Sequence, residues 1–223
     1  MKKSILTATA ALIIAPTGSA AILASYDFAT GGGNLSGTPD ANFTISDIAI
    51  TPGSSNNTGE FLNVANDLNA RFSGRGTPTE GDGFFEFTLT PLASDYTLQS
   101  ITWSDESIMT LAGGTTSVNF EVFSSMDTFT TALDTQVGST SDNDNRSVTG
   151  TVSLDISSLS AGGALSAATT FRVFVDNVGG TNGALGQRGY YIDNLAINGE
   201  VIPEPSAGLL SLLGLSLTLR RKR

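Results

Sequence analysis

The chain has 223 residues, of which 14% are charged and 39% hydrophobic, with 21 acidic residues against 11 basic ones. Cysteine and histidine are absent, which excludes disulfides, thiol nucleophiles, Ser-His-Asp relays and zinc sites with the usual ligands. Residues 21–202 carry 20 acids and five arginines, and this net charge of −15 repels phosphate backbones and argues against a nucleic-acid partner.

The first 20 residues have the composition and order of a secretory signal peptide. Lys2 and Lys3 precede a run of 11 mostly apolar residues, which a proline and small residues follow. Because 11 residues of helix cross only about half of a bilayer core, a permanent amino-terminal anchor is not expected. We expect export and cleavage after Ala20, with cleavage after Ala21 or Ala24 nearly as good.

The body of the chain alternates between apolar and polar side chains, which is the period of strands with one buried face. Gly-rich and polar breaks separate nine such segments, and no ten-residue stretch has convincing helical periodicity. The pattern predicts an all-β domain over residues 21–202, an antiparallel β-sandwich (jelly roll) of about nine strands. The nine segments are residues 25–29, 42–50, 60–64, 83–90, 97–103, 118–123, 151–157, 171–177 and 190–199.

Four aromatic side chains in or next to these segments are candidate glycan-binding groups, because a ring offers a flat apolar face and Tyr or Trp adds a polar group. Trp103, Tyr190 and Tyr191 are the main candidates, and Tyr96 is the fourth. Core packing is the competing interpretation for each of them. Tyr190 and Tyr191 are adjacent in a predicted strand, so their side chains must point to opposite faces and only one can belong to the core.

A pair of carboxylates, as in glycosidases, is the enzymatic route that the composition leaves open. Glu80, Asp82 and Glu86 cluster in the sequence, and so do Asp105 and Glu106. Neither cluster has the Glu-x-Asp-x-Glu arrangement of jelly-roll glucanases. We therefore expect no enzyme activity, and a carbohydrate hydrolase is kept as an alternative.

The last 21 residues, 203–223, have three parts. A Pro-Glu-Pro motif is followed by an apolar helix candidate at residues 207–219 and by four basic residues at 220–223. The basic cluster favours a cytoplasmic carboxyl terminus. Thirteen residues of helix rise about 20 Å, which is short against a hydrocarbon core of about 30 Å. We expect a short transmembrane helix that gives the chain membrane contact.

This tripartite order resembles the PEP-CTERM sorting signal of Gram-negative envelope proteins. The resemblance implies recognition by a membrane-embedded exosortase that removes the tail after transient anchoring in the inner membrane. It also implies a final location in the cell envelope or the extracellular matrix. The matching residues are Pro203, Glu204 and Pro205 in the motif and Arg220, Arg221 and Arg223 in the basic end.

The closing strand of the body resembles that of lectin-like jelly rolls and carbohydrate-binding modules. The resemblance is carried by Tyr-Ile-Asp-Asn-Leu at residues 191–195, with Ile197 and Gly199. In several such modules the aspartate of this strand helps to ligate a structural Ca²⁺ together with groups near the first strand. The resemblance thus makes Asp193 a candidate ligand. Asp27, near the first predicted strand, is a candidate partner by its position alone, because it matches no motif of these modules.

Together these features predict an exported, non-enzymatic protein that binds glycan or has a structural role in the exopolysaccharide layer. A passive surface or adhesive protein with no small ligand is the second alternative. Solvent exposure of Trp103 and the tyrosines would separate glycan binding from the passive role.

Overall fold

The computed structural model describes residues 20–28, 35–51, 60–64, 67–72, 84–92, 95–108, 117–138, 147–178 and 188–202, some of them by their backbone alone. These residues contain strands and two short 3₁₀ helices, η1 (Ser125–Asp127) and η2 (Ser157–Ser160), but no α-helix. The predicted all-β class is therefore confirmed. Residues 203–223, and the predicted signal peptide except Ala20, lie outside the described ranges.

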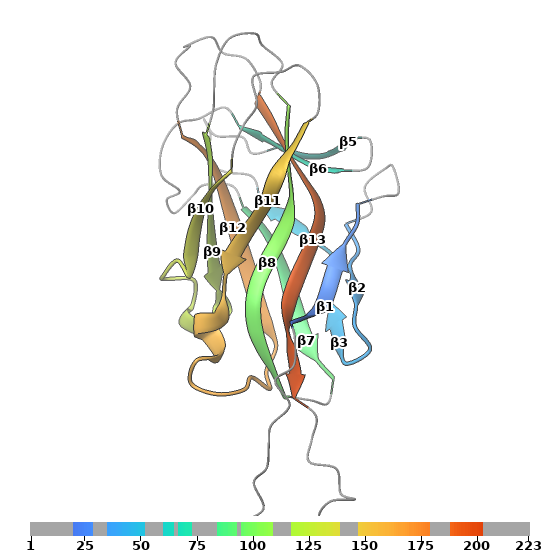
Figure 1. The fold of residues 1–223 in the computed structure, drawn as a ribbon, viewed down its shortest axis with the longest axis vertical. Coiled ribbons are helices and arrows are strands. Elements are labelled where there is room, and N and C mark those ends of the chain that lie inside the picture. Colours follow the sequence, from blue (N-terminus) through green and yellow to red (C-terminus); the bar gives the residue numbers. More distant parts are fainter. Residues whose placement is uncertain are drawn as a thin grey trace, which may run out of the picture.

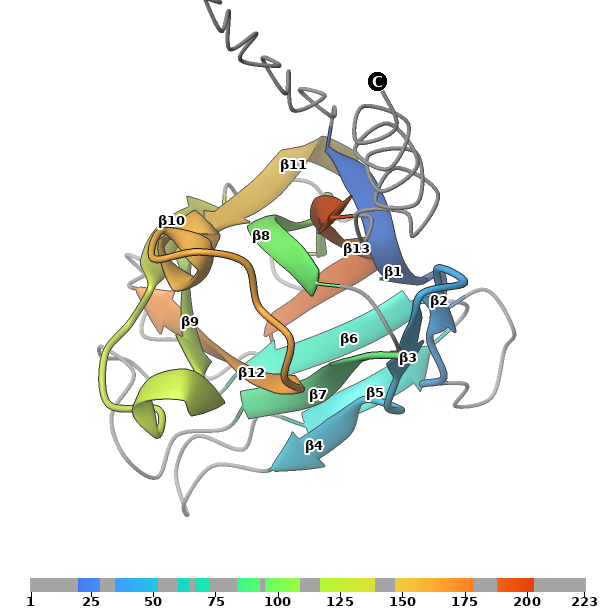
Figure 2. The same cartoon turned by 90° about the horizontal axis from the view of Figure 1, so that it is seen from below.

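The described strands form two antiparallel sheets that face each other (Figures 1 and 2). Sheet A has the order β11-β8-β13-β1-β2, and β6 pairs with both β13 and β5. Its strands are β1 (Ala21–Tyr26), β2 (Thr38–Pro39), β5 (Glu60–Val64), β6 (Asp67–Phe72), β8 (Asp95–Ile108), β11 (Ser147–Asp155) and β13 (Arg188–Ile202). Sheet B has the order β10-β9-β12-β7-β3, and β4 also pairs with β7. Its strands are β3 (Phe43–Ile45), β4 (Ala49–Thr51), β7 (Phe84–Pro91), β9 (Ser117–Ser124), β10 (Asp134–Gly138) and β12 (Thr169–Val178).

The strands β1 and β7 to β13 pair as one long hairpin that has been rolled up. β9 pairs with β10, β8 with β11, β7 with β12, and β1 with β13, so each early strand lies beside its late counterpart. Two further pairings join these four strand pairs into the two sheets: β12 with β9 in sheet B, and β13 with β8 in sheet A. This winding is that of a jelly roll.

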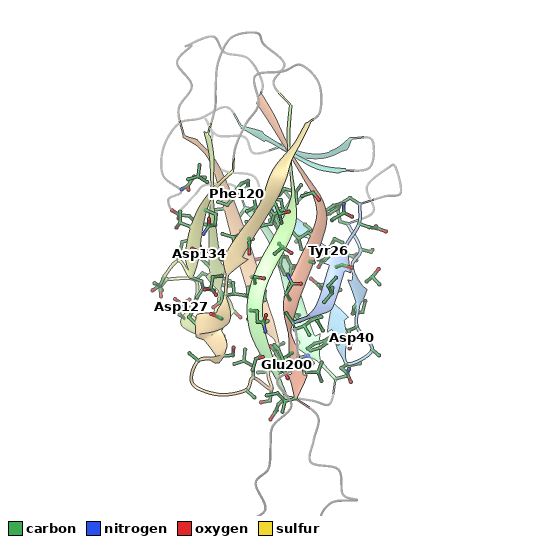
Figure 3. All side chains as sticks on the ribbon, in the orientation of Figure 1. Tyr26, Asp40, Phe120, Asp127, Asp134 and Glu200 are labelled. Atoms are coloured by element: carbon green, nitrogen blue, oxygen red, sulfur yellow. The ribbon has the colours of Figure 1, made fainter. Side chains whose placement is uncertain are left out.

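The core lies between the sheets and is rich in aromatic rings. From β7, Phe85 and Phe87 are at most 1% exposed, as their alternation with polar residues predicts. Trp103 of β8 meets Phe120 of β9 edge to face, with ring centroids 4.9 Å apart, and this contact links sheet A to sheet B. Figure 3 labels Phe120 within the sandwich and also Tyr26, whose hydroxyl donates a 2.6 Å hydrogen bond to the carbonyl of Ser46.

A β-bulge in β8 changes which of its side chains face the core. β13 pairs with Ser100 and then with Leu98, so Gln99 is the extra residue. Leu98 is buried before the bulge, and Ile101 and Trp103 are buried after it. A continuous alternation from Leu98 would have placed Trp103 on the outside of the sandwich.

Each of the nine predicted segments overlaps a strand, and residues 42–50 overlap both β3 and β4. Three described strands, β2, β6 and β10, lie outside the predicted segments. In the part of the chain that is described, no helix is long and apolar enough to cross a membrane.

Candidate binding face

The side of sheet B that points away from the core carries a cluster of aromatic side chains and one arginine. We call this cluster the aromatic face and define it by Phe84, Phe123, Phe129, Phe174 and Arg172. Three of the rings stand on strands β7, β9 and β12, at positions that alternate with buried core residues. All five side chains are partly exposed.

Three of the phenylalanines form a continuous row across neighbouring strands. Phe174 of β12 lies directly opposite Phe84 of β7 in the register, with ring centroids 5.0 Å apart. On its other side Phe174 meets Phe123 of β9 edge to face, with centroids 5.2 Å apart. Such cross-strand pairs contribute about 0.2–1 kcal/mol each to the stability of a sheet. The row also gives the outside of sheet B an apolar strip that crosses β7, β12 and β9, with Phe123 two residues from the position opposite Phe174.

Arg172 lies at the centre of the aromatic face and is held by three neighbours. Its Nε donates a hydrogen bond to Oε2 of Glu86, 2.9 Å away across the β12–β7 pair. Its guanidinium carbon lies 3.8 Å from the ring centroid of Phe129 and 4.7 Å from that of Phe84, which makes two cation–π contacts. Within the described residues its Nη groups donate to no protein acceptor, and its side chain is 32% exposed. These N–H donors are therefore available to a ligand.

A strained turn after η1 brings Phe129 to Arg172. Thr128 and Phe129 have φ angles of 61° and 59°, a left-handed conformation that costs a non-glycine residue on the order of 1–3 kcal/mol. The Phe129 N–H donates to the carbonyl of Ser124 at 2.9 Å, which holds the turn against β9. Asp127 closes it by accepting a 2.9 Å hydrogen bond from the Thr131 N–H at Oδ2. The backbone is thus held in an unfavourable conformation at the point that positions this ring.

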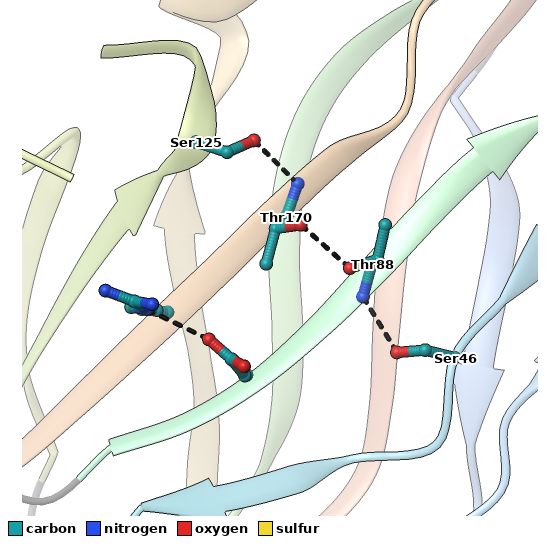
Figure 4. Close-up of polar contacts among 6 residues, drawn as sticks. Ser46, Thr88, Ser125 and Thr170 are labelled. Carbon is teal, nitrogen blue, oxygen red and sulfur yellow. Dashed lines mark hydrogen bonds and ion pairs between the residues drawn. The ribbon is translucent and has the colours of Figure 1, made fainter. Parts of the chain in front are cut away.

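A row of hydroxyl groups borders the aromatic face (Figure 4). The Thr170 N–H donates to Oγ of Ser125 at 3.0 Å, and the Thr170 and Thr88 hydroxyls lie 2.8 Å apart. The Thr88 N–H in turn donates to Oγ of Ser46 at 3.0 Å. Partly exposed rings, a carboxylate, arginine donors and hydroxyls therefore lie together on one side of sheet B. Such a surface can stack on apolar faces of a ligand and hydrogen-bond to its hydroxyl groups.

The structure contradicts a glycan-binding role for Trp103. The side chain is 1% exposed and packs on Phe120 inside the sandwich, so it has no ring face to offer a sugar. The bulge at Gln99 is the physical reason, because it turns Trp103 inward. Tyr96 is also buried, at 0% exposure, and its hydroxyl donates a 2.9 Å hydrogen bond to the carbonyl of Ala167.

The two remaining tyrosine candidates stay untested. The backbones of Tyr190 and Tyr191 lie in β13, opposite Ser107 and Glu106 of β8. Their side chains lie outside what the structure describes. Their strand belongs to sheet A, whereas the aromatic face lies on sheet B.

Of the two candidate calcium ligands, Asp193 lies in β13 and Asp27 directly follows β1, which pairs with β13. The register of this pair ends with Tyr26 opposite Leu195, so Asp27 is one residue beyond the paired part of β1. Asp27 is exposed, and the side chain of Asp193 is not described. Among the described residues, no group of three or more His, Cys, Asp or Glu side chains is placed to hold a metal ion.

Several other predicted positions lie outside the described part of the chain. All six residues of the sorting motif do so: Pro203, Glu204, Pro205, Arg220, Arg221 and Arg223. Of the candidate carboxylates, Glu80 and Asp82 are also outside it, whereas Glu86 is engaged with Arg172.

Sequence reasoning overlooked the aromatic face, although the sequence contains a signal for it. Along their alternating strands, Phe84, Phe123 and Phe174 stand at positions where a polar, outward-facing residue is expected. Phe85 and Phe87 stand at the inward-facing positions. A large ring at a position that alternation assigns to solvent is informative, since packing in the core does not account for it. Phe129 has no such signal, because a turn and not a strand positions it.

A scan against protein-family models finds no match, and a search of curated proteins finds no similar sequence. Among solved structures, the chain is similar to the family 11 carbohydrate-binding module of a cellulosomal cellulase of Clostridium thermocellum. The identity is 14%, the TM-score is 0.31, and the match covers 83% of this chain and 98% of that one. A second structure of a family 11 module from Clostridium thermocellum, in complex with a β-1,3-1,4-mixed-linked tetrasaccharide, matches at 14% identity and a TM-score of 0.26. This match covers 82% of this chain and 91% of that one. These TM-scores are too low to establish a shared fold, so the jelly-roll winding rests on the strand pairing alone.

Proposed function

We propose that the protein is an exported component of the cell envelope or extracellular matrix whose jelly roll binds polysaccharide without chemical turnover. The observation that carries the proposal is the row of Phe84, Phe174 and Phe123 around Arg172 on the outside of sheet B. Burial in the core does not account for these rings, and sugar rings bind to such surfaces by stacking.

The expected affinity follows from the size of the face. A few stacking contacts of about 0.5–1.5 kcal/mol each, with hydrogen bonds from Arg172 and to Glu86, are consistent with weak binding. We expect a Kd between about 10 µM and 1 mM, or about −4 to −7 kcal/mol. A neutral polysaccharide is favoured over an acidic one, because Glu86 neutralises Arg172 and the domain carries a net charge of −15.

Retention of the mature protein on immobilised polysaccharides tests this proposal. Neutral and acidic polysaccharides are compared at low and at moderate salt, with heat-denatured protein as the control. Retention on a neutral polysaccharide that denaturation abolishes supports the proposal. Absence of retention on every polysaccharide contradicts it and leaves the passive surface role.

The proposed location rests on the sequence at the two ends. The charge, apolar run and small residues of positions 1–20 support export, and the Pro203-Glu204-Pro205 motif with its basic tail supports sorting by an exosortase. The mass of the protein isolated from its native host tests the sorting step. A protein that keeps the four basic residues 220–223 contradicts removal of the tail.

We also propose that Ca²⁺ stabilises the domain through Asp193 and Asp27, because Asp193 lies in β13 and Asp27 directly follows β1, the strand paired with it. Calcium prefers six to eight oxygen ligands, so backbone carbonyls and water would complete the site. A ligand that binds only the native state at a hundredfold excess over Kd adds about 2.7 kcal/mol of stability.

The melting temperature should therefore rise with calcium and fall in chelator, and Asp193→Ala should abolish this difference. Asp95→Ala, an exposed acid at the far end of the β13–β8 pairing, is the matched control. An unchanged melting curve in chelator excludes calcium as a structural partner.

A further inference from the structure

The first strand of the sandwich begins directly at the predicted signal-peptide cleavage sites. β1 starts at Ala21, directly after the first of three candidate bonds, and contains the other two. Burial changes abruptly along it. Ala20 and Ala21 are exposed and Ile22 is 57% exposed, whereas Leu23 is 0% and Ala24 is 1% exposed.

Leu23 is fixed by contacts from three directions. A bulge between Ile22 and Ala24 turns it into the core, next to the central strand β13. Its side chain packs over Gly199, where a Cβ atom would come within 2.7 Å of the Leu23 Cδ1 atom. Its carbonyl accepts a 2.8 Å hydrogen bond from the N–H of Asp40, which ties β1 to the end of β2. The absence of a side chain at Gly199 thus makes the space that Leu23 fills.

The three cleavage sites therefore have different consequences for the fold. Cleavage after Ala20 leaves β1 complete, and cleavage after Ala21 removes one exposed residue at the start of the strand. Cleavage after Ala24 removes four of the six residues of β1, including Leu23, and leaves the space above Gly199 empty. Removal of a buried leucine side chain is among the most destabilising changes in a core.

We propose that the mature protein begins at Ala21 or Ile22, and that the bond after Ala24 is not the processing site. This inference rests on the proposed export of the chain. The fold does not direct the protease, which acts on the unfolded segment; it determines which cleavage product is a stable domain. Residues 21–24 thus belong to the sandwich and not to the signal.

Expression of the full chain in a Gram-negative host, followed by intact-mass and amino-terminal analysis of the exported fraction, tests the assignment. An amino terminus at Ala21 or Ile22 is the expected result. An amino terminus at Ser25 on a folded protein overturns the inference and leaves export intact. A protein that keeps Lys2 and Lys3 overturns the proposed export itself, so the two failures are distinguishable.

Two neighbouring substitutions in the full chain provide an independent measurement. Leu23→Ala should lower the melting temperature of the exported protein by roughly 5–15 °C, because the leucine is buried. Ile22→Ala changes an exposed residue of the same strand and should shift it by less than about 2 °C. Equal melting temperatures for the two variants would show that Leu23 is not part of the core and would overturn the inference.

Discussion

The two faces of sheet B carry phenylalanines from the same strands, but the inner rings are buried and the outer rings are partly exposed. Phe85 and Phe87 on the inner face are at most 1% exposed, and they pack against rings of the core. Phe84 and Phe174 on the outer face are partly exposed, and Arg172 and Glu86 stand beside them. The inner rings are explained by folding alone, since burial removes their whole surface from water.

The outer rings are not explained in this way. They leave ring surface in water, and Phe129 reaches them from a backbone conformation that itself costs free energy. A cluster that is exposed, partly apolar and supported by strain is more readily explained by binding than by stability. The difference between the faces is therefore measurable, because changes on one should affect folding and changes on the other should affect binding.

The largest expected effect is on the inner face. Phe87→Ala should lower the free energy of unfolding by about 3–5 kcal/mol, because it removes a fully buried ring from a packed core. Phe174→Ala on the outer face should lower it by about 1 kcal/mol, since the ring is only partly buried. Denaturant unfolding of both variants measures this. Equal losses would mean that the outer rings are part of the core.

The two faces of sheet B should also differ in their response to alkaline pH. Burial, with a smaller effect from Asp47, raises the pKa of Tyr26, whose ring packs against Phe87, and burial also raises the pKa of Tyr96. These tyrosines stabilise the fold fully below the unfolded-state pKa of about 10, and this stability is lost as the pH rises toward their higher folded-state values.

The melting temperature should therefore decline above about pH 10. Tyr26→Phe should make this decline shallower, although it also removes the hydrogen bond to Ser46. The aromatic face contains no tyrosine, so binding should persist until the fold is lost. A melting temperature that does not change between pH 8 and 11 would contradict the role of the buried hydroxyls.

Substitution of an outer ring should have a smaller effect, on the affinity for polysaccharide. Phe174→Ala removes the central ring of the row and should weaken polysaccharide binding about fivefold to tenfold. Affinity electrophoresis or titration calorimetry measures the change. Ile22→Ala, an exposed apolar residue on sheet A, is the control and should bind as the wild type does. If the two variants bind equally well, the ligand does not contact this face.

The smallest effect concerns the ion pair on the outer face. Glu86→Gln should change stability by less than about 1 kcal/mol, because both partners are about a third exposed. Arg172→Lys keeps the charge but loses the planar group between Phe84 and Phe129, so it should weaken binding more than it changes stability. A double-mutant cycle on binding tests whether the two residues act together; additive effects would contradict a shared role.

Much of the fold could be predicted from alternation, and the exceptions have physical causes. β10 (Asp134–Gly138) is polar and lies at the edge of sheet B, so it has little need of an apolar face. β2 has two residues, one of them proline, and gives almost no pattern. β6 does alternate, with Leu68, Ala70 and Phe72, and this signal was overlooked.

The candidate site could be predicted less well than the fold. The expected role of Trp103 depended on which way its strand faced, and the single extra residue Gln99 reverses that direction. The bulge leaves one trace in the sequence, a spacing of three between the apolar residues Leu98 and Ile101, which puts Trp103 in the phase of Ile101. The outward phenylalanines could have been found from their phase, but their contact with Phe129 depends on tertiary structure.

The pairing of β1 with β13 has a consequence for how the protein folds. β1 lies in sheet A beside β13, with Ala21 opposite Gly199, and among the described strands its only other partner is the two-residue β2. Domains dominated by contacts this distant in the sequence fold slowly, because the loop must close before the contacts form. An emerging chain cannot complete sheet A until residues 188–202 have been synthesised. Under the proposed export through a membrane pore, this order would keep the chain unfolded until nearly all of it is available to cross.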